Sequence, residues 1–144
     1  MDRRQLIRSS LAMAGLPPLC CTTPEIPPAS FTVQGAVLII DLQQAPDLRK
    51  PGGAVRVVDL ERKVNLIVVH PAKNRFAVLD RSCTHGGAPV VYNRHNQTVQ
   101  CVSWGHSEFA LDGALLGGSA KRPLRAYEIR RAGNRLEIVL EAKA

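Results

Sequence analysis

The fold is indicated first by two short stretches, Cys83-Thr-His85-Gly-Gly-Ala-Pro89 and Cys101-Val-Ser-Trp-Gly-His106. Each stretch carries one cysteine and one histidine, and 15 residues separate His85 from Cys101. Glycines in both stretches suit a backbone that turns tightly, because glycine adopts conformations that other residues avoid. The two stretches are therefore predicted to be loops that present two thiols and two imidazoles as one set of donors.

This donor set has a specific chemical use. Two thiolates and two neutral imidazoles are the ligands of a 2Fe-2S centre of mixed ligation, with the sulfurs on one iron and the histidines on the other. Thiolates are soft, charged donors, whereas imidazoles leave the cluster less negative and easier to reduce. The sequence predicts a protein that carries single electrons on a 2Fe-2S cluster held by Cys83, His85, Cys101 and His106.

The two stretches resemble the cluster loops of the Rieske family, in which Cys-x-His is followed after about 15 to 17 residues by Cys-x-x-His. The first stretch is similar to that of the ferredoxin-type branch. In the second, four residues rather than two separate Cys101 from His106, so Trp104 occupies the register of the family's histidine. Residues 107–113 and 117–124 again resemble the family, in which a glycine turn and a proline-bearing strand close over the cluster. The resemblance therefore places an insertion inside the second loop.

The resemblance also implies a low or intermediate potential within the family's range of roughly −150 to +300 mV. High-potential members carry an extra cysteine in each loop, joined as a disulfide, and serine and tyrosine hydroxyls that donate to cluster sulfurs. Here Ala88 stands in the first loop, and Val102 and Ser103 in the second, so that bridge is ruled out. Ser107 is left as a hydroxyl donor, while Phe109 stands at the tyrosine position.

The remaining residues near the motifs have simpler interpretations. Trp104 is interpreted as a lid over the cluster loop, and Gly105 as the point where the chain folds back to bring His106 to the iron. His70 is interpreted as a residue at a strand-to-turn junction. His95 lies in a polar stretch and is interpreted as a solvated turn residue, or as a substitute ligand if His106 does not reach the iron.

The pattern past the N-terminal region predicts an all-β domain. Apolar runs bounded by turn residues predict strands over residues 36–42, 55–60, 65–69, 75–79, 98–102, 124–130 and 135–140, with hairpin turns at 70–74 and 132–134. The cluster loops lie in a segment of about 81–123. The resemblance, which spans roughly 36–140, implies Rieske-like stacked antiparallel sheets with a cluster-binding subdomain inserted between base hairpins.

The N-terminus predicts export. Residues 1–21 resemble a twin-arginine signal, with Arg3 and Arg4 ahead of a short apolar segment. That route carries folded proteins, as a cofactor inserted before export requires. Cys20 and Cys21 are candidates for lipidation, which would tether the protein to a membrane.

Composition bounds the remaining organisation. Residues 22–34, rich in Pro, Thr and Ser, are expected to be a flexible stalk before a single domain over 35–144. Hydrophobic residues make up 45% of the chain and aromatic residues 4%, so the core must consist of Val, Leu, Ile and Ala. No run approaches the 18 or more apolar residues of a spanning helix.

The net charge of +7 is concentrated near the C-terminus, and either a solvated face or a docking patch for an acidic redox partner or an anionic lipid surface accounts for it. Its basic residues there are Lys121, Arg122, Arg125, Arg130, Arg131 and Arg135. Nucleic acid is disfavoured, because few aromatics are present to stack on bases.

The most favoured hypothesis is a periplasmic electron carrier rather than an enzyme, with anchoring to the membrane left open. It is similar to small exported Rieske subunits that relay electrons from a molybdenum-containing oxidoreductase subunit to a cytochrome. Two alternatives remain: the ferredoxin component of a ring oxygenase, and a degenerate Rieske fold that holds zinc or no metal and serves as an interaction module.

Overall fold

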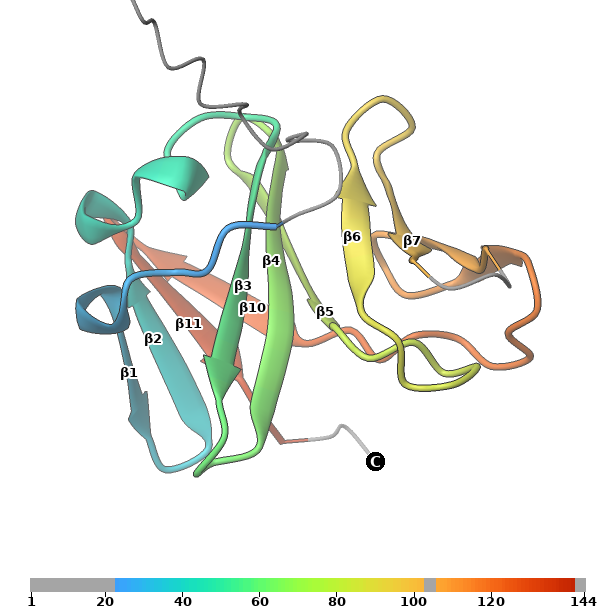
Figure 1. The fold of residues 1–144 in the computed structure, drawn as a ribbon. Coiled ribbons are helices and arrows are strands. Elements are labelled where there is room, and N and C mark those ends of the chain that lie inside the picture. Colours follow the sequence, from blue (N-terminus) through green and yellow to red (C-terminus); the bar gives the residue numbers. More distant parts are fainter. Residues whose placement is uncertain (1–22, 103–105, 142–144) are drawn as a thin grey trace, which may run out of the picture.

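The computed structural model describes residues 23–102 and 106–141 as three layers of antiparallel sheet (Figure 1). The strand orders are β1-β2-β11-β10, β3-β4-β5 and β6-β7-β8-β9. Figure 1 shows the β3-β4-β5 sheet between the other two. The export-leader and lipidation interpretations of residues 1–21 lie outside the described residues and stay predictions.

The strands are short, as is usual for stacked antiparallel sheets. They are β1 (Phe31–Gln34), β2 (Val37–Asp41), β3 (Gly53–Asp59), β4 (Val64–Ala72), β5 (Arg75–Asp80), β6 (Val90–Asn93), β7 (Thr98–Cys101), β8 (Glu108–Ala110), β9 (Leu115–Gly117), β10 (Glu128–Ala132) and β11 (Arg135–Val139). Three single-turn 3-10 helices accompany them: η1 (Pro28–Ser30), η2 (Leu42–Gln44) and η3 (Pro46–Leu48). Within the described parts of the chain, no helix has the length and hydropathy that crossing a bilayer requires.

The all-β prediction and the inserted subdomain are confirmed. The β6-β7-β8-β9 sheet is formed entirely by the chain between β5 and β10, which belong to the other two sheets. Each predicted run contains a strand, although β10 begins only at Glu128, inside the predicted run 124–130. Strands β1, β6, β8 and β9 were not predicted, because three or four residues show little alternating pattern.

The predicted stalk over 22–34 is corrected by the structure for residues 23–34. The Ile26 side chain is only 1% exposed and packs in the core, and its N–H donates to the Arg56 carbonyl at 2.9 Å. Strand β1 then pairs with β2, with Phe31 opposite Ile40. Proline-rich composition predicts extended chain, but regularly placed apolar residues such as Val33 allow that chain to pack on the sheets.

Strand β4 belongs to two cores at once. Val64, Leu66 and Val68 face a base core shared with β2 and β11, while Ile67 and Val69 face a second core under the β6-β7-β8-β9 sheet. Successive residues of a strand point to opposite faces, so a run buried on both faces reads as continuously apolar. Full burial of each such side chain stabilises the fold by roughly 1.5–3 kcal/mol. The middle sheet thereby joins the base to the inserted subdomain.

The interpretation of His70 as a strand-to-turn residue is also corrected. Strand β4 continues past it to Ala72, and His70 is buried. Its Nδ1–H donates to the Leu48 carbonyl at 2.7 Å, because a carbonyl oxygen only accepts, and its ring stacks on Phe76 with 4.3 Å between centroids. His70 therefore fixes η3 against the middle sheet.

Candidate metal centre

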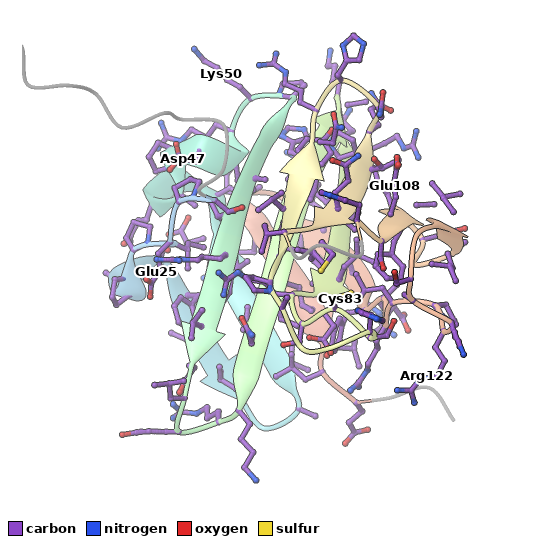
Figure 2. The ribbon with its side chains drawn as sticks, turned by 45° about the vertical axis from the view of Figure 1, so that its right-hand side comes forward. Glu25, Asp47, Lys50, Cys83, Glu108 and Arg122 are labelled. Atoms are coloured by element: carbon purple, nitrogen blue, oxygen red, sulfur yellow. The ribbon has the colours of Figure 1, made fainter. Side chains whose placement is uncertain are left out.

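The first loop, residues 81–89 between β5 and β6, wraps around Cys83. The Cys83 N–H donates to the Ala88 carbonyl at 2.8 Å, and the Gly87 N–H donates to the Cys83 carbonyl at 2.9 Å. Gly87 has φ +75°, a left-handed conformation that glycine adopts without steric cost. The loop therefore closes on itself and directs the Cys83 side chain, which is 3% exposed, into the second core (Figure 2).

The second loop, residues 102–107, connects β7 to β8. Cys101 ends β7, is buried opposite Val90, and its N–H donates to the Ser107 carbonyl at 2.8 Å. Residues 103–105 lie outside the described residues, so the interpretations of Trp104 and Gly105 stay predictions. His106 is exposed and has φ 44°, a conformation uncommon for residues other than glycine.

The third loop, residues 118–123, holds the first two loops together. Its Ala120 N–H donates to the buried Ser107 hydroxyl at 2.9 Å, and the Thr84 hydroxyl donates to the Arg122 carbonyl at 2.9 Å. A Cβ on Gly118 would lie 2.4 Å from the Ser107 Cα, so only glycine permits this approach. The third loop, which begins at the glycine turn that the resemblance implied, thus contacts both other loops.

The Cys83 and Cys101 side chains lie close enough to interact with each other. Burial raises the pKa of the Cys83 thiol, and the adjacent Cys101 thiol raises it further, whereas the His85 backbone N–H and the Ser107 hydroxyl lower it by donating to the sulfur. Hydrogen bonds to a charged sulfur stabilise the thiolate, which is the form that binds metal. The environment of Cys83 therefore fits a buried, metal-bound sulfur.

The histidines are placed differently from the cysteines. His85 and His106 are exposed, each on the loop of its cysteine partner. Within residues 23–102 and 106–141, no three or more His, Cys, Asp or Glu side chains are grouped as ligands of a single ion. The structure thus brings the two cysteines together and leaves the two imidazoles at the surface. In a 2Fe-2S centre each iron takes only two protein ligands, so such a cluster does not require all four side chains to meet at one point.

His95 lies at the wrong end of a hairpin to replace His106. In the β6-β7 pair, Val90 is opposite Cys101 at one end and Asn93 is opposite Thr98 at the other, and His95 lies beyond that second end. Three residues of strand span about 10 Å. The turn interpretation of His95 agrees with its exposed position, whereas the alternative as a substitute ligand is not supported by this register.

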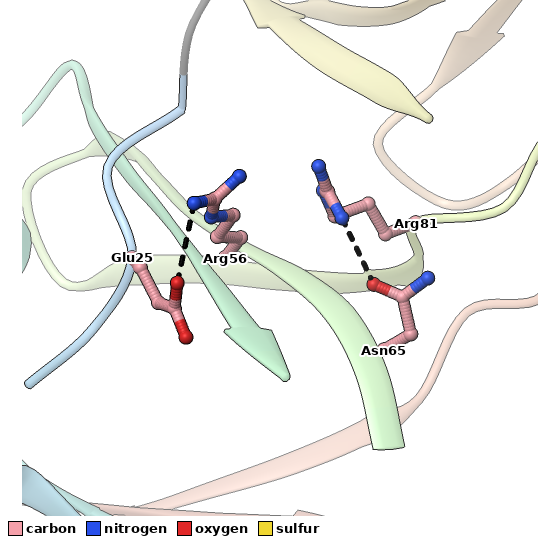
Figure 3. A network of polar contacts seen from close by, with 4 residues as sticks. All are labelled: Glu25, Arg56, Asn65 and Arg81. Carbon is pink, nitrogen blue, oxygen red and sulfur yellow. Dashed lines mark hydrogen bonds and ion pairs between the residues drawn. The ribbon is translucent and has the colours of Figure 1, made fainter. Parts of the chain in front are cut away.

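A polar chain that the sequence analysis missed anchors the first loop to β4 (Figure 3). The side-chain Nδ2 of Asn65 donates to the Ser82 hydroxyl at 3.2 Å, and Arg81 Nη1 donates to the side-chain Oδ1 of Asn65 at 3.2 Å. The Arg56–Glu25 ion pair lies beside it, also at 3.2 Å. The available signal was a single asparagine inside the otherwise apolar run of residues 64–69 in β4.

Comparison with known proteins identifies this arrangement of loops. The model of the Rieske 2Fe-2S domain family matches residues 39–128, more than half of the chain. No curated protein matches the chain significantly.

Three solved structures share the fold. The plasma-membrane Rieske protein PetC3 of the cyanobacterium Synechocystis is 24% identical, with a TM-score of 0.51 over 59% of this chain and 84% of that one. The ferredoxin of carbazole 1,9a-dioxygenase from Nocardioides aromaticivorans is 20% identical, with a TM-score of 0.57 over 72% and 95%. A complex of reduced oxygenase and oxidized ferredoxin in carbazole 1,9a-dioxygenase contains a chain that is 20% identical, with a TM-score of 0.62 over 77% and 99%.

Proposed function

We propose, since the chain belongs to the Rieske 2Fe-2S domain family, that Cys83 and Cys101 bind one iron of its cluster and that His85 and His106 bind the other. The family's cluster supplies one-electron redox chemistry. The chain is accordingly an electron carrier.

The observation that carries the ligand proposal is the contact between the two buried thiols. They come from segments that are separate in sequence, and the His85 N–H and the Ser107 hydroxyl both donate to the Cys83 sulfur. These hydrogen bonds stabilise the negative charge of a metal-bound thiolate. The imidazoles of His85 and His106, the proposed ligands of the other iron, are exposed to solvent.

We further propose that the protein is exported to the periplasm and serves a cytochrome or a molybdenum-containing oxidoreductase. The support is the twin-arginine-like sequence of residues 1–21, with lipidation at Cys20 or Cys21 as the proposed membrane tether. A ferredoxin for a ring oxygenase is the second candidate, supported by the likeness of the first loop to ferredoxin-type Rieske loops and by the carbazole dioxygenase ferredoxin among the fold neighbours. Replacing Arg3 and Arg4 by lysine and measuring periplasmic protein separates the two, because only the first needs export.

The ligand proposal is tested by iron and sulfide analysis with electron paramagnetic resonance of the reduced protein. We expect equal iron and sulfide and the electron paramagnetic resonance signal of a reduced 2Fe-2S cluster of mixed ligation. His106→Ala should abolish this signal, while His95→Ala, which removes an exposed imidazole at the far end of the β6-β7 hairpin, should retain it. A colourless zinc protein, or an intact signal in His106→Ala, would refute the assignment.

The exposure of the two imidazoles is tested by voltammetry at several pH values. If one proton accompanies each electron in the alkaline range, the midpoint potential falls by about 59 mV per pH unit, the one-electron value. His85→Cys or His106→Cys variants that keep a cluster should lose this slope in part, because a thiolate replaces a protonatable ring. A midpoint that is independent of pH would contradict solvent-exposed histidine ligands.

A further inference from the structure

The third loop displays two cations beside the site while its backbone is held in place. Hydrogen bonds from Ala120 to Ser107 and from Thr84 to the Arg122 carbonyl fix the backbone on both sides of Lys121. Lys121 and Arg122 are nevertheless exposed, and Figure 2 shows Arg122 on the outside of the subdomain that carries Cys83. Their charges are therefore presented at a position determined by the first and second loops.

Within the described residues, neither of these two cations forms an ion pair with an acidic side chain. The ion pairs within the described residues join Arg56 to Glu25, Arg62 to Asp59 and Arg130 to Glu128, and none includes Lys121 or Arg122. An exposed pair of like charges without counter-charges creates a positive potential at that surface.

The nearby acids do not cancel this potential. Between residues 81 and 123 the chain has four basic and two acidic side chains, Glu108 and Asp112, for a surplus of two positive charges. The Glu108 carboxylate accepts from the Thr98 hydroxyl, on the face of the β7-β8 pair opposite the buried Phe109. Asp112 accepts from the Ala114 N–H within the β8-β9 turn.

Two exposed apolar side chains lie in the second loop and in β9, just before the third loop. Val102 in the second loop is 50% exposed, and Leu116, two residues before the third loop, is 57% exposed. Exposed apolar side chains with charges around them are typical of transient protein interfaces, in which apolar contact gives affinity and the charges steer the encounter.

We propose that Lys121 and Arg122 form a docking site for a redox partner whose surface is acidic around its own electron entry point. The inference rests on the proposed function, because a partner that approaches the exposed His85 and His106 meets the two cations of the third loop. One electron passes between the proteins, and no bond is formed or broken.

The proposal is tested with two small oxidants of opposite charge. Reduced protein gives one electron to ferricyanide, forming ferrocyanide, or to tris(phenanthroline)cobalt(III), forming cobalt(II). At about 10 mM ionic strength, where the Debye length is about 30 Å, the double variant Lys121→Glu/Arg122→Glu should lower the ratio of the anionic to the cationic rate constant about tenfold. At about 1 M salt, where that length is about 3 Å, the difference should vanish.

A matched control is available on the base of the molecule. Lys73→Glu/Arg75→Glu makes the same charge change at exposed positions of the β4-β5 hairpin. Arg75 begins β5, whose other end leads into the first loop, and six residues of strand place it nearly 20 Å away. In this control variant, the ratio of the anionic to the cationic rate constant should stay within about twofold of the wild-type ratio. Equal effects of the two double variants, or no effect of the first, would overturn the proposal.

A second measurement does not depend on electron transfer. The redox-inert trianion hexacyanocobaltate(III) should shift the Arg122 Nε–H resonance of the purified protein, and this shift should be lost in Lys121→Glu. If the protein holds no cluster, the resonance still reports on the patch, so failure of the proposed function and failure of this inference are distinguishable. Absence of the shift would overturn the inference.

A membrane surface is the competing occupant. Vesicles of phosphatidylglycerol should bind the wild type and Lys121→Glu/Arg122→Glu equally. If Lys121→Glu/Arg122→Glu abolishes vesicle binding and leaves the ratio of the two oxidant rate constants unchanged, the two cations bind lipid and the proposal is overturned.

Discussion

Gly118 is the residue at which the backbone of the third loop touches that of the second. It has φ +91°, and a Cβ there would lie 2.7 Å from the His106 carbonyl oxygen. Both the conformation and the contact exclude other residues. The position of His106 therefore depends on a residue that has no side chain.

Gly118→Ala should lower the free energy of unfolding by about 2–4 kcal/mol and reduce iron content. The control is Gly117→Ala, where a Cβ meets nothing within 4 Å; its effect should stay within about 0.5 kcal/mol. Denaturant unfolding and iron analysis of both variants provide the measurement. Similar losses in the two would show that the close approach to the second loop is unimportant.

Ser107 connects the third loop to the sulfur of Cys83. Its hydroxyl accepts from the Ala120 N–H and donates to the Cys83 sulfur. Hydrogen bonds to cluster sulfurs stabilise the more negative, reduced state and so raise the potential. Ser107→Ala should therefore lower the midpoint potential.

A hydrogen bond that is about 1 kcal/mol stronger in the reduced state corresponds to about 40 mV for one electron, which is the decrease expected for Ser107→Ala. Thr98→Val is the control, because it removes a buried hydroxyl that donates to Glu108 and not to a sulfur. Voltammetry should give an unchanged potential for this control. Equal shifts in the two variants would argue against the Ser107 contact.

Among the elements, β4 is the one that anchors the first loop to the base. Near the start of β4, the side-chain oxygen of Asn65 accepts a hydrogen bond from Arg81 Nη1. The side-chain nitrogen of Asn65 donates to the hydroxyl of Ser82, the residue before Cys83. The Arg81 N–H also donates to the Asn65 backbone carbonyl at 3.0 Å. These hydrogen bonds therefore fix the position of the first loop relative to β4, a strand that is largely buried.

Asn65→Ala should cost about 1–2 kcal/mol of unfolding free energy, since it leaves partly buried partners without hydrogen bonds. It should also speed loss of the cluster to a chelator, because the start of the first loop is released. Asn96→Ala, in the exposed turn after β6, is the control and should stay within about 0.5 kcal/mol. Chelator-induced bleaching at the wild-type rate in Asn65→Ala would contradict this role.

In the molecule as a whole, two cores serve two purposes. The base core holds Leu136 and Ile138 of β11, whereas the second core holds Phe109 together with both cysteines. Because interiors are closely packed, a volume change is felt mainly by the core in which it occurs. Stability and cluster retention should therefore respond separately to mutation.

Phe109→Leu and Ile138→Val are expected to destabilise the protein by similar amounts, about 1–1.5 kcal/mol. Only Phe109→Leu should also accelerate cluster loss, because the packing under Cys83 and Cys101 loosens. Thermal unfolding followed in parallel with visible absorbance in the presence of a chelator measures both effects. Faster bleaching in Ile138→Val as well would mean that the two cores are not independent.

The sequence alone determined the family resemblance and the all-β class, and it predicted the donor set. Strand pattern depends on neighbours along the chain, so most strands were predictable. Residue type and loop spacing made Cys83 and Cys101 candidate ligands. The export leader and the four-ligand assignment stay predictions.

Tertiary structure decided what depends on contacts between distant segments. It packed residues 23–34 onto the base, brought the Cys83 and Cys101 thiols together, directed Ser107 toward sulfur and placed Asn65 under the first loop. Each of these contacts requires the register of the sheets and the stacking of three layers, which no local pattern specifies.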